Sequence, residues 1–198
     1  MSSKDDEDYI KIKAILLGGS GVRETNLINV TIGNQFCEAS KTTNCCSMVQ
    51  KYLAINNNKF QINLWDTMIQ ESYKSISKLF FRGSHIVIFV YDITSYESFK
   101  GLEDWIHFAN NTINYDYISG IVGNEIDSFL ESKVPKEEAE NFAQLKQMKF
   151  KLVSTKENPK NFENFLIELI QQYKILERRK KTILKKENSK KDKNNCNC

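Results

Sequence analysis

The sequence has no run of eighteen consecutive apolar residues, although 40% of its 198 residues are hydrophobic. A transmembrane helix needs about 20 such residues, so none is predicted. The first nine residues are acidic and lack the apolar core of a secretory signal, and Ser2 stands where N-myristoylation requires glycine. These absences predict one compact domain that is made and kept in the cytosol.

Disulfide and zinc patterns are also missing. The chain has five cysteines and two histidines, with no Cys-x-x-Cys pair and no histidine cluster. An odd number of cysteines without a secretion signal argues against a disulfide framework, and the missing ligand spacing argues against zinc. The fold is therefore expected to depend on its hydrophobic core.

The net charge of +3 hides an uneven distribution. Residues 177–198 contain nine Lys/Arg against three Asp/Glu, whereas the preceding residues contain 19 against 22. We predict a disordered acidic leader over residues 1–9, one domain over residues 10–177 and a basic flexible tail over residues 178–198. No aromatic residues lie between the basic residues of the tail, so a nucleic-acid arm is the less favoured interpretation.

Strand and helix patterns alternate along the predicted domain. The run Asn56-Asn57-Asn58-Lys59 between the second and third strands is typical of a hairpin turn. Alternation after one hairpin predicts an α/β fold, with a mainly parallel six-stranded sheet, one antiparallel hairpin strand and helices on both faces. A ligand is expected at the carboxyl ends of the strands. The predicted strands are 10–17, 49–55, 60–65, 85–91, 117–122 and 150–153, and the later helices are 99–113, 135–148 and 161–179.

The first strand leads into a glycine-rich loop over residues 18–21, and a helix pattern follows. This order is typical of a phosphate-binding loop, because backbone N–H groups and a helix N-terminus converge on one anion. The template G-x-x-x-x-G-K-[ST] is met at Gly18 and Thr25. However, Arg23 replaces the second glycine and Glu24 replaces the lysine. Taken alone, the loop is weak evidence for a phosphate-binding site.

Motifs at the other strand ends carry a resemblance to a known family. The sequence has WDTMIQE at residues 65–71, FRGSHIVIFVYDITSYESF at 81–99, GNEID at 123–127, STK at 154–156 and CNC at the end. From about residue 12 onward, the chain resembles small GTPases of the Ras superfamily, specifically the Rab type. The resemblance implies the P-loop small-GTPase fold, a monomer, and binding of GTP or GDP with Mg²⁺.

The resemblance also implies roles for individual residues. The implied Mg²⁺ ligands are Thr25, Thr43 and Asp66. The implied switch residues are Thr43, Asp66 and Ile69. Gln70 would position the attacking water. The implied phosphate-binding residues are Gly18, Ser20, Gly21, Val22, Arg23, Glu24, Thr25 and Asn26. The implied guanine-binding residues are Phe36, Asn124, Glu125, Asp127, Ser154, Thr155 and Lys156.

Several of these residues also have ordinary structural explanations. Phe36 fits a core position as well as a base-stacking one. Thr25 fits a hydroxyl that only bonds the start of a helix, Ser154 fits a helix cap, and Lys156 fits a surface charge. The assignments therefore depend on the whole set of motifs rather than on any one residue.

Departures from the family pattern bear on nucleotide handling. The family's lysine at position 24 meets the β- and γ-phosphates, and one unit-charge contact at roughly 4 Å is worth about 4 kcal/mol at an effective dielectric near 20. Glu24 replaces that attraction by repulsion, although Arg23 beside it would reach a phosphate. Ile69 replaces the glycine that senses the γ-phosphate, and Glu125 replaces the lysine that stacks on the purine. We expect weakened GTP binding and hydrolysis, with a pseudo-GTPase binding module as the alternative.

The tail predicts attachment to a membrane. Cys196 and Cys198 resemble the double geranylgeranylation site of Rab proteins, and nearby basic residues add attraction to an anionic leaflet. The implied location is the cytoplasmic face of endomembranes, lipid-anchored and with a cytosolic pool. The implied partners are effector, escort and exchange proteins of vesicle and protein transport.

Overall fold

A six-stranded mixed sheet forms the centre of the protein. The computed structural model describes residues 9–19, 21–22, 24–31, 47–66, 80–125, 132–154, 158 and 160–194. Within them the strand order is β2-β3-β1-β4-β5-β6. β2 pairs antiparallel with β3, and the other neighbouring strands are parallel. The strands are β1 (Ile10–Gly18), β2 (Ser47–Ile55), β3 (Asn58–Asp66), β4 (Ile86–Asp92), β5 (Ile118–Glu125) and β6 (Lys149–Ser154).

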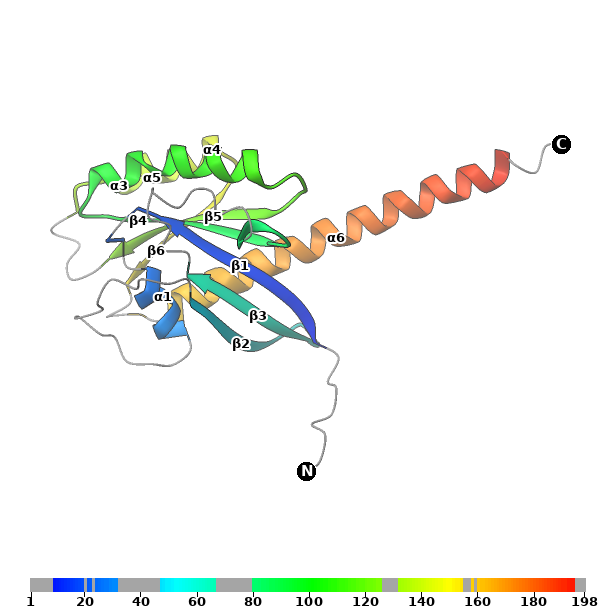
Figure 1. Ribbon diagram of the computed structural model, residues 1–198, viewed down its shortest axis with the longest axis horizontal. Helices are drawn as coiled ribbons and strands as arrows, with labels where there is room; N and C mark the ends of the chain where they lie inside the picture. Colours follow the sequence, from blue (N-terminus) through cyan, green and yellow to red (C-terminus); the bar gives the residue numbers. More distant parts are fainter. Residues whose placement is uncertain are drawn as a thin grey trace, which may run out of the picture.

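Helices cover both faces of the sheet, with α3, α4 and α5 on one side and α1 and α6 on the other (Figure 1). This arrangement confirms the predicted α/β fold. Among the described residues, no helix combines the length and the apolar character that crossing a membrane requires. The helices are α1 (Glu24–Thr31), α3 (Tyr96–Lys100), α4 (Leu102–Thr112), α5 (Lys136–Leu145) and α6 (Lys160–Asn194).

The apolar run of β4 supplies both halves of the core. Ile88 and Val90 join the cluster beneath α1 and α6, whereas Val87 and Phe89 join the cluster beneath α3, α4 and α5. Successive side chains of a strand point to opposite faces, so a strand covered on both sides must be apolar throughout.

The predicted hairpin turn joins β2 to β3. Asn56 and Asn57 have φ angles of 46° and 60°, in the left-handed region that asparagine tolerates better than most residues. The resulting register pairs Ser47 with Asp66. The turn therefore fixes where β3 ends and places Asp66 at its carboxyl end.

Two helical segments differ from the predicted ranges. Residues 99–113 were predicted as one helix, whereas α3 and α4 meet at Gly101 and α3 begins earlier, after Ser95. The Ser95 hydroxyl caps α3 by accepting from the Ser98 N–H at 3.2 Å. α6 continues past the predicted end at Arg179 to Asn194, because this range has no Gly or Pro and many strong helix formers. The helix therefore extends into the residues assigned to the tail.

The carboxyl ends of the parallel strands meet at one edge of the sheet. Leu16 of β1 pairs with Asp66, and Gly18 pairs with Val90. On the other side, Glu125 at the end of β5 pairs with Ser154. The ends of the strands that precede the loop motifs in the sequence thus lie at the same edge, as expected for a parallel sheet.

Candidate functional site

The loop after β1 needs glycine at two positions for different reasons. A Cβ atom added to Gly18 would lie 2.5 Å from the Val90 carbonyl oxygen and 2.6 Å from Val22 Cγ2, which is too close for any side chain. Gly21 has a φ of 89°, a conformation that glycine adopts without strain. The loop is closed by a 3.4 Å hydrogen bond from the Val22 N–H to the Gly19 carbonyl.

Glu24 is the first residue of α1, and its side chain is only 4% exposed. Its Oε1 would lie 2.8 Å from a Cβ atom on Gly18, so the carboxyl group rests directly against the loop. Negative charge near a helix N-terminus is favourable because the first N–H groups of the helix have no partners inside it. The acidic side chain therefore lies inside the predicted phosphate-binding loop rather than in solvent.

Burial makes this carboxyl group resist ionisation. It raises the pKa of Glu24 from 4.5 to about 8; a hydrogen bond from the residue's own backbone opposes the rise, and the charge of Asp66 adds to it. Burial also raises the pKa of Asp66, against a hydrogen bond from Thr25. Both shifts have the sign expected when two acidic groups are buried near each other.

Thr25 and Asp66, two of the predicted Mg²⁺ ligands, are in direct contact. The Thr25 hydroxyl donates to Asp66 Oδ2 at 2.5 Å. Asp66 is completely buried, and its Oδ1 has no hydrogen-bond partner within the described part of the chain. Hydroxyl and carboxylate oxygens are ligands that Mg²⁺ prefers. The orphaned Oδ1 and the all-oxygen donor set therefore fit such an ion.

Asn124, predicted to contact guanine, links two of the loops. It is fully buried at the end of β5, and its Nδ2 donates to the Val22 carbonyl at 2.9 Å. Its Oδ1 has no partner among the residues that the structure describes. The sequence did not predict this link, because the two residues are 102 positions apart.

Asn26 and Ser154 are also buried at this edge. Asn26 is 1% exposed, and neither atom of its amide group has a hydrogen-bond partner in the described ranges. Ser154 is 9% exposed, and its carbonyl accepts from the Asn158 N–H at 3.2 Å. Buried polar groups normally have partners, so the amide of Asn26 is a candidate for binding a polar ligand.

The remaining predicted residues stay predictions. The backbone of Glu125 is described as part of β5, but its side chain is not. The other predicted site residues outside the described ranges are Ser20, Arg23, Phe36, Thr43, Ile69, Gln70, Asp127, Thr155, Lys156, Cys196 and Cys198.

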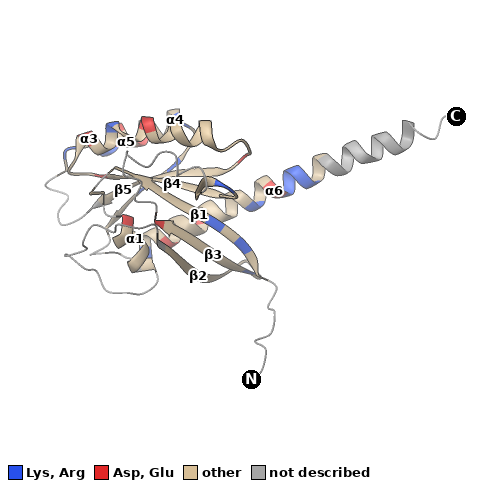
Figure 2. Ribbon diagram, in the orientation of Figure 1, with Lys and Arg blue, Asp and Glu red and all other residues tan. Residues whose placement is uncertain are grey.

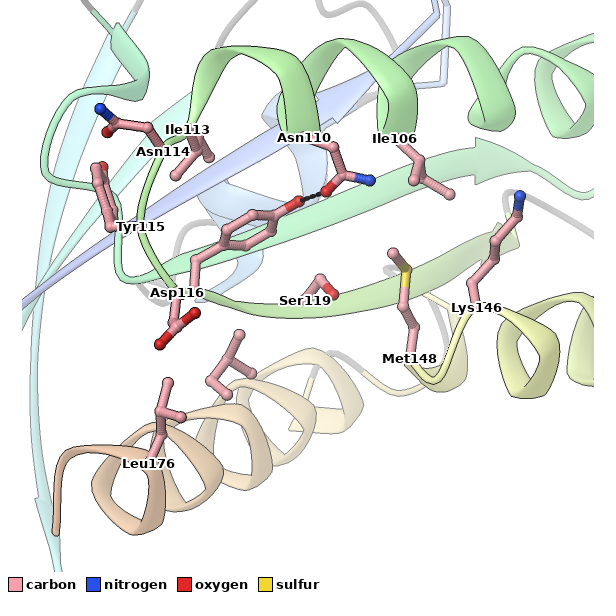
Figure 3. Close-up of a pocket in the computed structure, with 12 residues that line it drawn as sticks. Ile106, Asn110, Ile113, Asn114, Tyr115, Asp116, Ser119, Lys146, Met148 and Leu176 are labelled. Carbon is pink, nitrogen blue, oxygen red and sulfur yellow. Dashed lines mark hydrogen bonds between the residues drawn. The ribbon is translucent and has the colours of Figure 1, made fainter. Parts of the chain in front are cut away.

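A cavity of about 640 Å³ lies away from these residues, between the end of α4, the start of β5 and α6 (Figure 3). Its lining includes Ile106, Asn110, Tyr117, Met148 and Leu176. The Tyr117 hydroxyl donates to Asn110 Oδ1 at 2.6 Å. This cavity is at the amino end of β5, whereas parallel sheets bind ligands at their carboxyl ends. We therefore place the functional site at the loop edge.

Comparisons with known proteins identify the family of this chain. The Ras family profile matches residues 13–175. The Ras-related protein RABA1e of Arabidopsis thaliana is 30% identical over 175 residues, covering 88% of this chain and 80% of that protein. The Ras-related protein Rab-11C of Dictyostelium discoideum is 31% identical over 173 residues, covering 85% and 76%.

The Ras-related protein Rab-12 of Homo sapiens is 32% identical over 157 residues, which cover 79% of this chain. The match spans 64% of the length of that relative. The six-stranded mixed sheet with helices on both faces agrees with the profile match. The chain is a member of the Ras family of small GTPases, and within it of the Rab type.

Proposed function

We propose that this protein is a Rab-like small GTPase of vesicle and protein transport in which guanine-nucleotide binding and GTP hydrolysis are weakened. One observation carries the proposal. The carboxyl group of Glu24 is buried against Gly18 at the start of α1, where a phosphate-binding loop would present its N–H groups and a lysine to an anion. An ionised Glu24 repels phosphate, and a protonated one lacks the positive charge of lysine.

The rest of the pocket retains features that support nucleotide binding. Thr25 and Asp66 offer oxygen ligands for Mg²⁺, and bound Mg²⁺ would neutralise charge that develops on the phosphates. Asn124 holds the loop backbone at Val22, which keeps the phosphate and base loops in register. In this proposal Asp127 accepts hydrogen bonds from guanine and Gln70 positions the attacking water.

The alternative is a pseudo-GTPase, a membrane-tethered binding module without nucleotide cycling. The raised pKa values of both Glu24 and Asp66 favour it, because they show two buried acidic groups without a compensating cation among the described residues. The replacements at Ile69 and Glu125 point in the same direction. Such a module would present one fixed surface to its partners.

Attachment to the cytoplasmic face of endomembranes completes the proposal. Residues 178–181 are all Lys or Arg and are exposed on α6, where Figure 2 shows basic residues on the part of the helix that leaves the sheet. Each basic residue near an anionic leaflet contributes about 1 kcal/mol. Geranylgeranyl groups on Cys196 and Cys198 would supply the anchor, and escort, exchange and effector proteins would be the partners.

Binding of a fluorescent guanine nucleotide with Mg²⁺ tests the proposal. The wild type is compared with the double variant Arg23→Gly/Glu24→Lys, which restores the loop pattern. Glu97→Lys on α3 is the control, since it makes the same charge change as Glu24→Lys at an exposed position.

We expect at least a hundredfold gain in affinity for the double variant, because about 4 kcal/mol per charge contact corresponds to nearly three decades. The control should bind as the wild type does. Micromolar or tighter binding by the wild type contradicts the pseudo-GTPase alternative. A double variant without a gain contradicts the role given to Glu24.

The anchor has a separate test. Mass spectrometry of the C-terminal peptide from cells should find lipid on Cys196 and Cys198, and Cys196→Ser/Cys198→Ser should shift the protein to the cytosolic fraction. Unchanged membrane partition of that variant would rule out the lipid anchor.

A further inference from the structure

The first turn of α1 and the end of β3 each bring a buried carboxyl group to this edge of the sheet. Glu24 is 4% exposed and Asp66 is completely buried, and the charge of Asp66 acts on Glu24. Thr25 follows Glu24 in sequence and donates to Asp66 at 2.5 Å. Within the described residues, neither acid forms an ion pair. Buried charges are usually paired or bind metal ions.

We propose that Glu24, Thr25 and Asp66 bind a divalent cation, Mg²⁺ or Mn²⁺, in the absence of nucleotide. Glu24 provides from the chain itself the anionic oxygen that the phosphates of a nucleotide would otherwise provide. The inference rests on the proposed function, because it concerns the same pocket and the same substitution of lysine by glutamate. It goes beyond that function by giving the altered pocket a ligand of its own.

The backbone places Glu24, Thr25 and Asp66 at the same edge of the sheet. Leu16 pairs with Asp66 across β1 and β3, and Gly18 lies two residues further along β1, where it contacts the Glu24 carboxyl group. The Glu24 carboxyl group and the backbone of Asp66 therefore both lie at the carboxyl end of β1. A second observation points to a ligand: Asp66 Oδ1 is fully buried and has no hydrogen-bond partner within the described residues.

The donor chemistry selects the class of ligand. Thr25 offers a hydroxyl and the two acids offer carboxylates, so every donor is an oxygen, as hard divalent cations prefer. Mg²⁺ is commonly held by one or two carboxylates and completes its octahedron with water. Among the described residues, no group of three or more His, Cys, Asp or Glu side chains forms a metal cluster. A site with only two charged ligands should bind in the range of about 0.1 to 1 mM.

Cation binding to the full-length, nucleotide-free protein tests the inference. After treatment with a chelator, the melting temperature is measured during titration with MgCl₂ or MnCl₂, with KCl at matched ionic strength as the salt control. We expect a saturable rise with both divalent salts and none with KCl, because a ligand that binds only the folded state stabilises it. Electron paramagnetic resonance of Mn²⁺ should independently count one bound ion per chain.

The variant Glu24→Gln replaces the carboxyl group, which a cation would bind in its ionised form, with a neutral amide of the same shape. We expect its apparent Kd for Mn²⁺ to weaken at least about tenfold, since loss of even an outer-shell partner costs 10- to 100-fold. Glu97→Gln, at an exposed position on α3, should bind as the wild type does. The resonance measurement reports binding directly, so it holds even if Glu24→Gln melts at a different temperature.

Two results would overturn the inference: no bound Mn²⁺ in the wild type at millimolar concentration, or an unchanged Kd in Glu24→Gln. The variant Glu24→Lys separates this inference from the proposed function. It should lose the nucleotide-free Mn²⁺ signal and gain nucleotide affinity. Loss of the signal without a gain in nucleotide affinity would count against the proposed function alone.

Discussion

The hydroxyl of Thr25 donates a 2.5 Å hydrogen bond to Oδ2 of Asp66 and thereby joins the first turn of α1 to the end of β3. Asp66 is fully buried, and its Oδ1 has no hydrogen-bond partner in the described structure. The bond from Thr25 to Oδ2 therefore offsets part of the free-energy cost of burying this carboxyl group. The contact should therefore contribute to the stability of the fold.

Thr25→Val keeps the shape of the side chain but removes the donor. We expect the free energy of unfolding to fall by about 1–3 kcal/mol, the usual cost of leaving a buried polar group without its partner. Urea denaturation without nucleotide or Mg²⁺ measures the change. Thr25→Ser retains the hydroxyl and should lose much less. A Thr25→Val variant as stable as the wild type would contradict the role given to this hydrogen bond.

The buried Glu24 predicts a pH dependence of stability. Its pKa rises from 4.5 to about 8 on folding, so the folded state binds its proton more tightly than the unfolded state does. The stabilisation is complete below pH 4.5 and is lost as the pH rises through about 8. Urea denaturation at a series of pH values should show this decline in the wild type and a flatter profile in Glu24→Gln. Parallel profiles would mean that Glu24 does not cause the decline.

The sequence predicted the sheet and the edge at which its parallel strands end because these depend on local patterns. The apolar run of β4 and the Asn56-Asn57 turn were enough to predict a buried central strand and a hairpin. The predicted end of α6 at Arg179 was too early, since the apolar periodicity stops there while helix-forming residues continue to Asn194. Periodicity reports packing against the domain and does not report where a helix ends.

The state of the site was less predictable. The sequence showed that Glu24 replaces a lysine, but its burial depends on contact with Gly18 and on the nearby charge of Asp66. The bond from Asn124 to Val22 likewise connects distant parts of the chain. Such contacts are set by the packing of whole strands and helices, so no local pattern specifies them.

His85 predicts a pH dependence of the opposite sign. Its Nδ1 accepts from the Lys13 N–H at 2.9 Å. Burial lowers the pKa of His85, the charge of Glu177 opposes this and that of Lys13 adds to it. The folded state thus favours neutral imidazole, and stability present above the ordinary pKa of 6.5 is lost as the pH falls below it.

His85→Asn keeps a hydrogen-bond acceptor but cannot titrate. In the Glu24→Gln background, which removes the titration of Glu24, we expect the acid-side loss of stability to become smaller in His85→Asn. Urea denaturation on both sides of pH 6.5 measures it. A steeper loss in the variant would reverse the sign we assign.

The link between Asn124 and Val22 predicts a cost for removing the amide donor. In Asn124→Asp a carboxylate oxygen would face the Val22 carbonyl in place of Nδ2, which now donates at 2.9 Å. Repulsion and burial of a charge should lower the free energy of unfolding by at least about 1–3 kcal/mol. Urea denaturation of the nucleotide-free protein checks this. A variant as stable as the wild type would mean that the side chain can turn away from Val22.

The outer part of α6 should contribute little to the stability of the domain. Residues 178–183 are exposed, and the last described ion pair to the body joins Lys180 to Asp116 at 3.0 Å between largely exposed groups. Exposed pairs of this kind are worth about 0–1 kcal/mol. Ending the chain after residue 181 should therefore change the free energy of unfolding by less than about 0.5 kcal/mol.

Ending the chain after residue 172 gives the matched comparison. It removes Tyr173, whose ring centroid lies 5.0 Å from that of His85, and Leu176, which lines the cavity beside β5 (Figure 3). We expect a loss of about 2–5 kcal/mol, because both side chains are partly buried and Tyr173 packs against the core. Urea denaturation of both truncated chains gives the two values. A large loss already at residue 181 would show that the projecting helix packs on the domain, and it would weaken the case that this segment is free to meet a membrane.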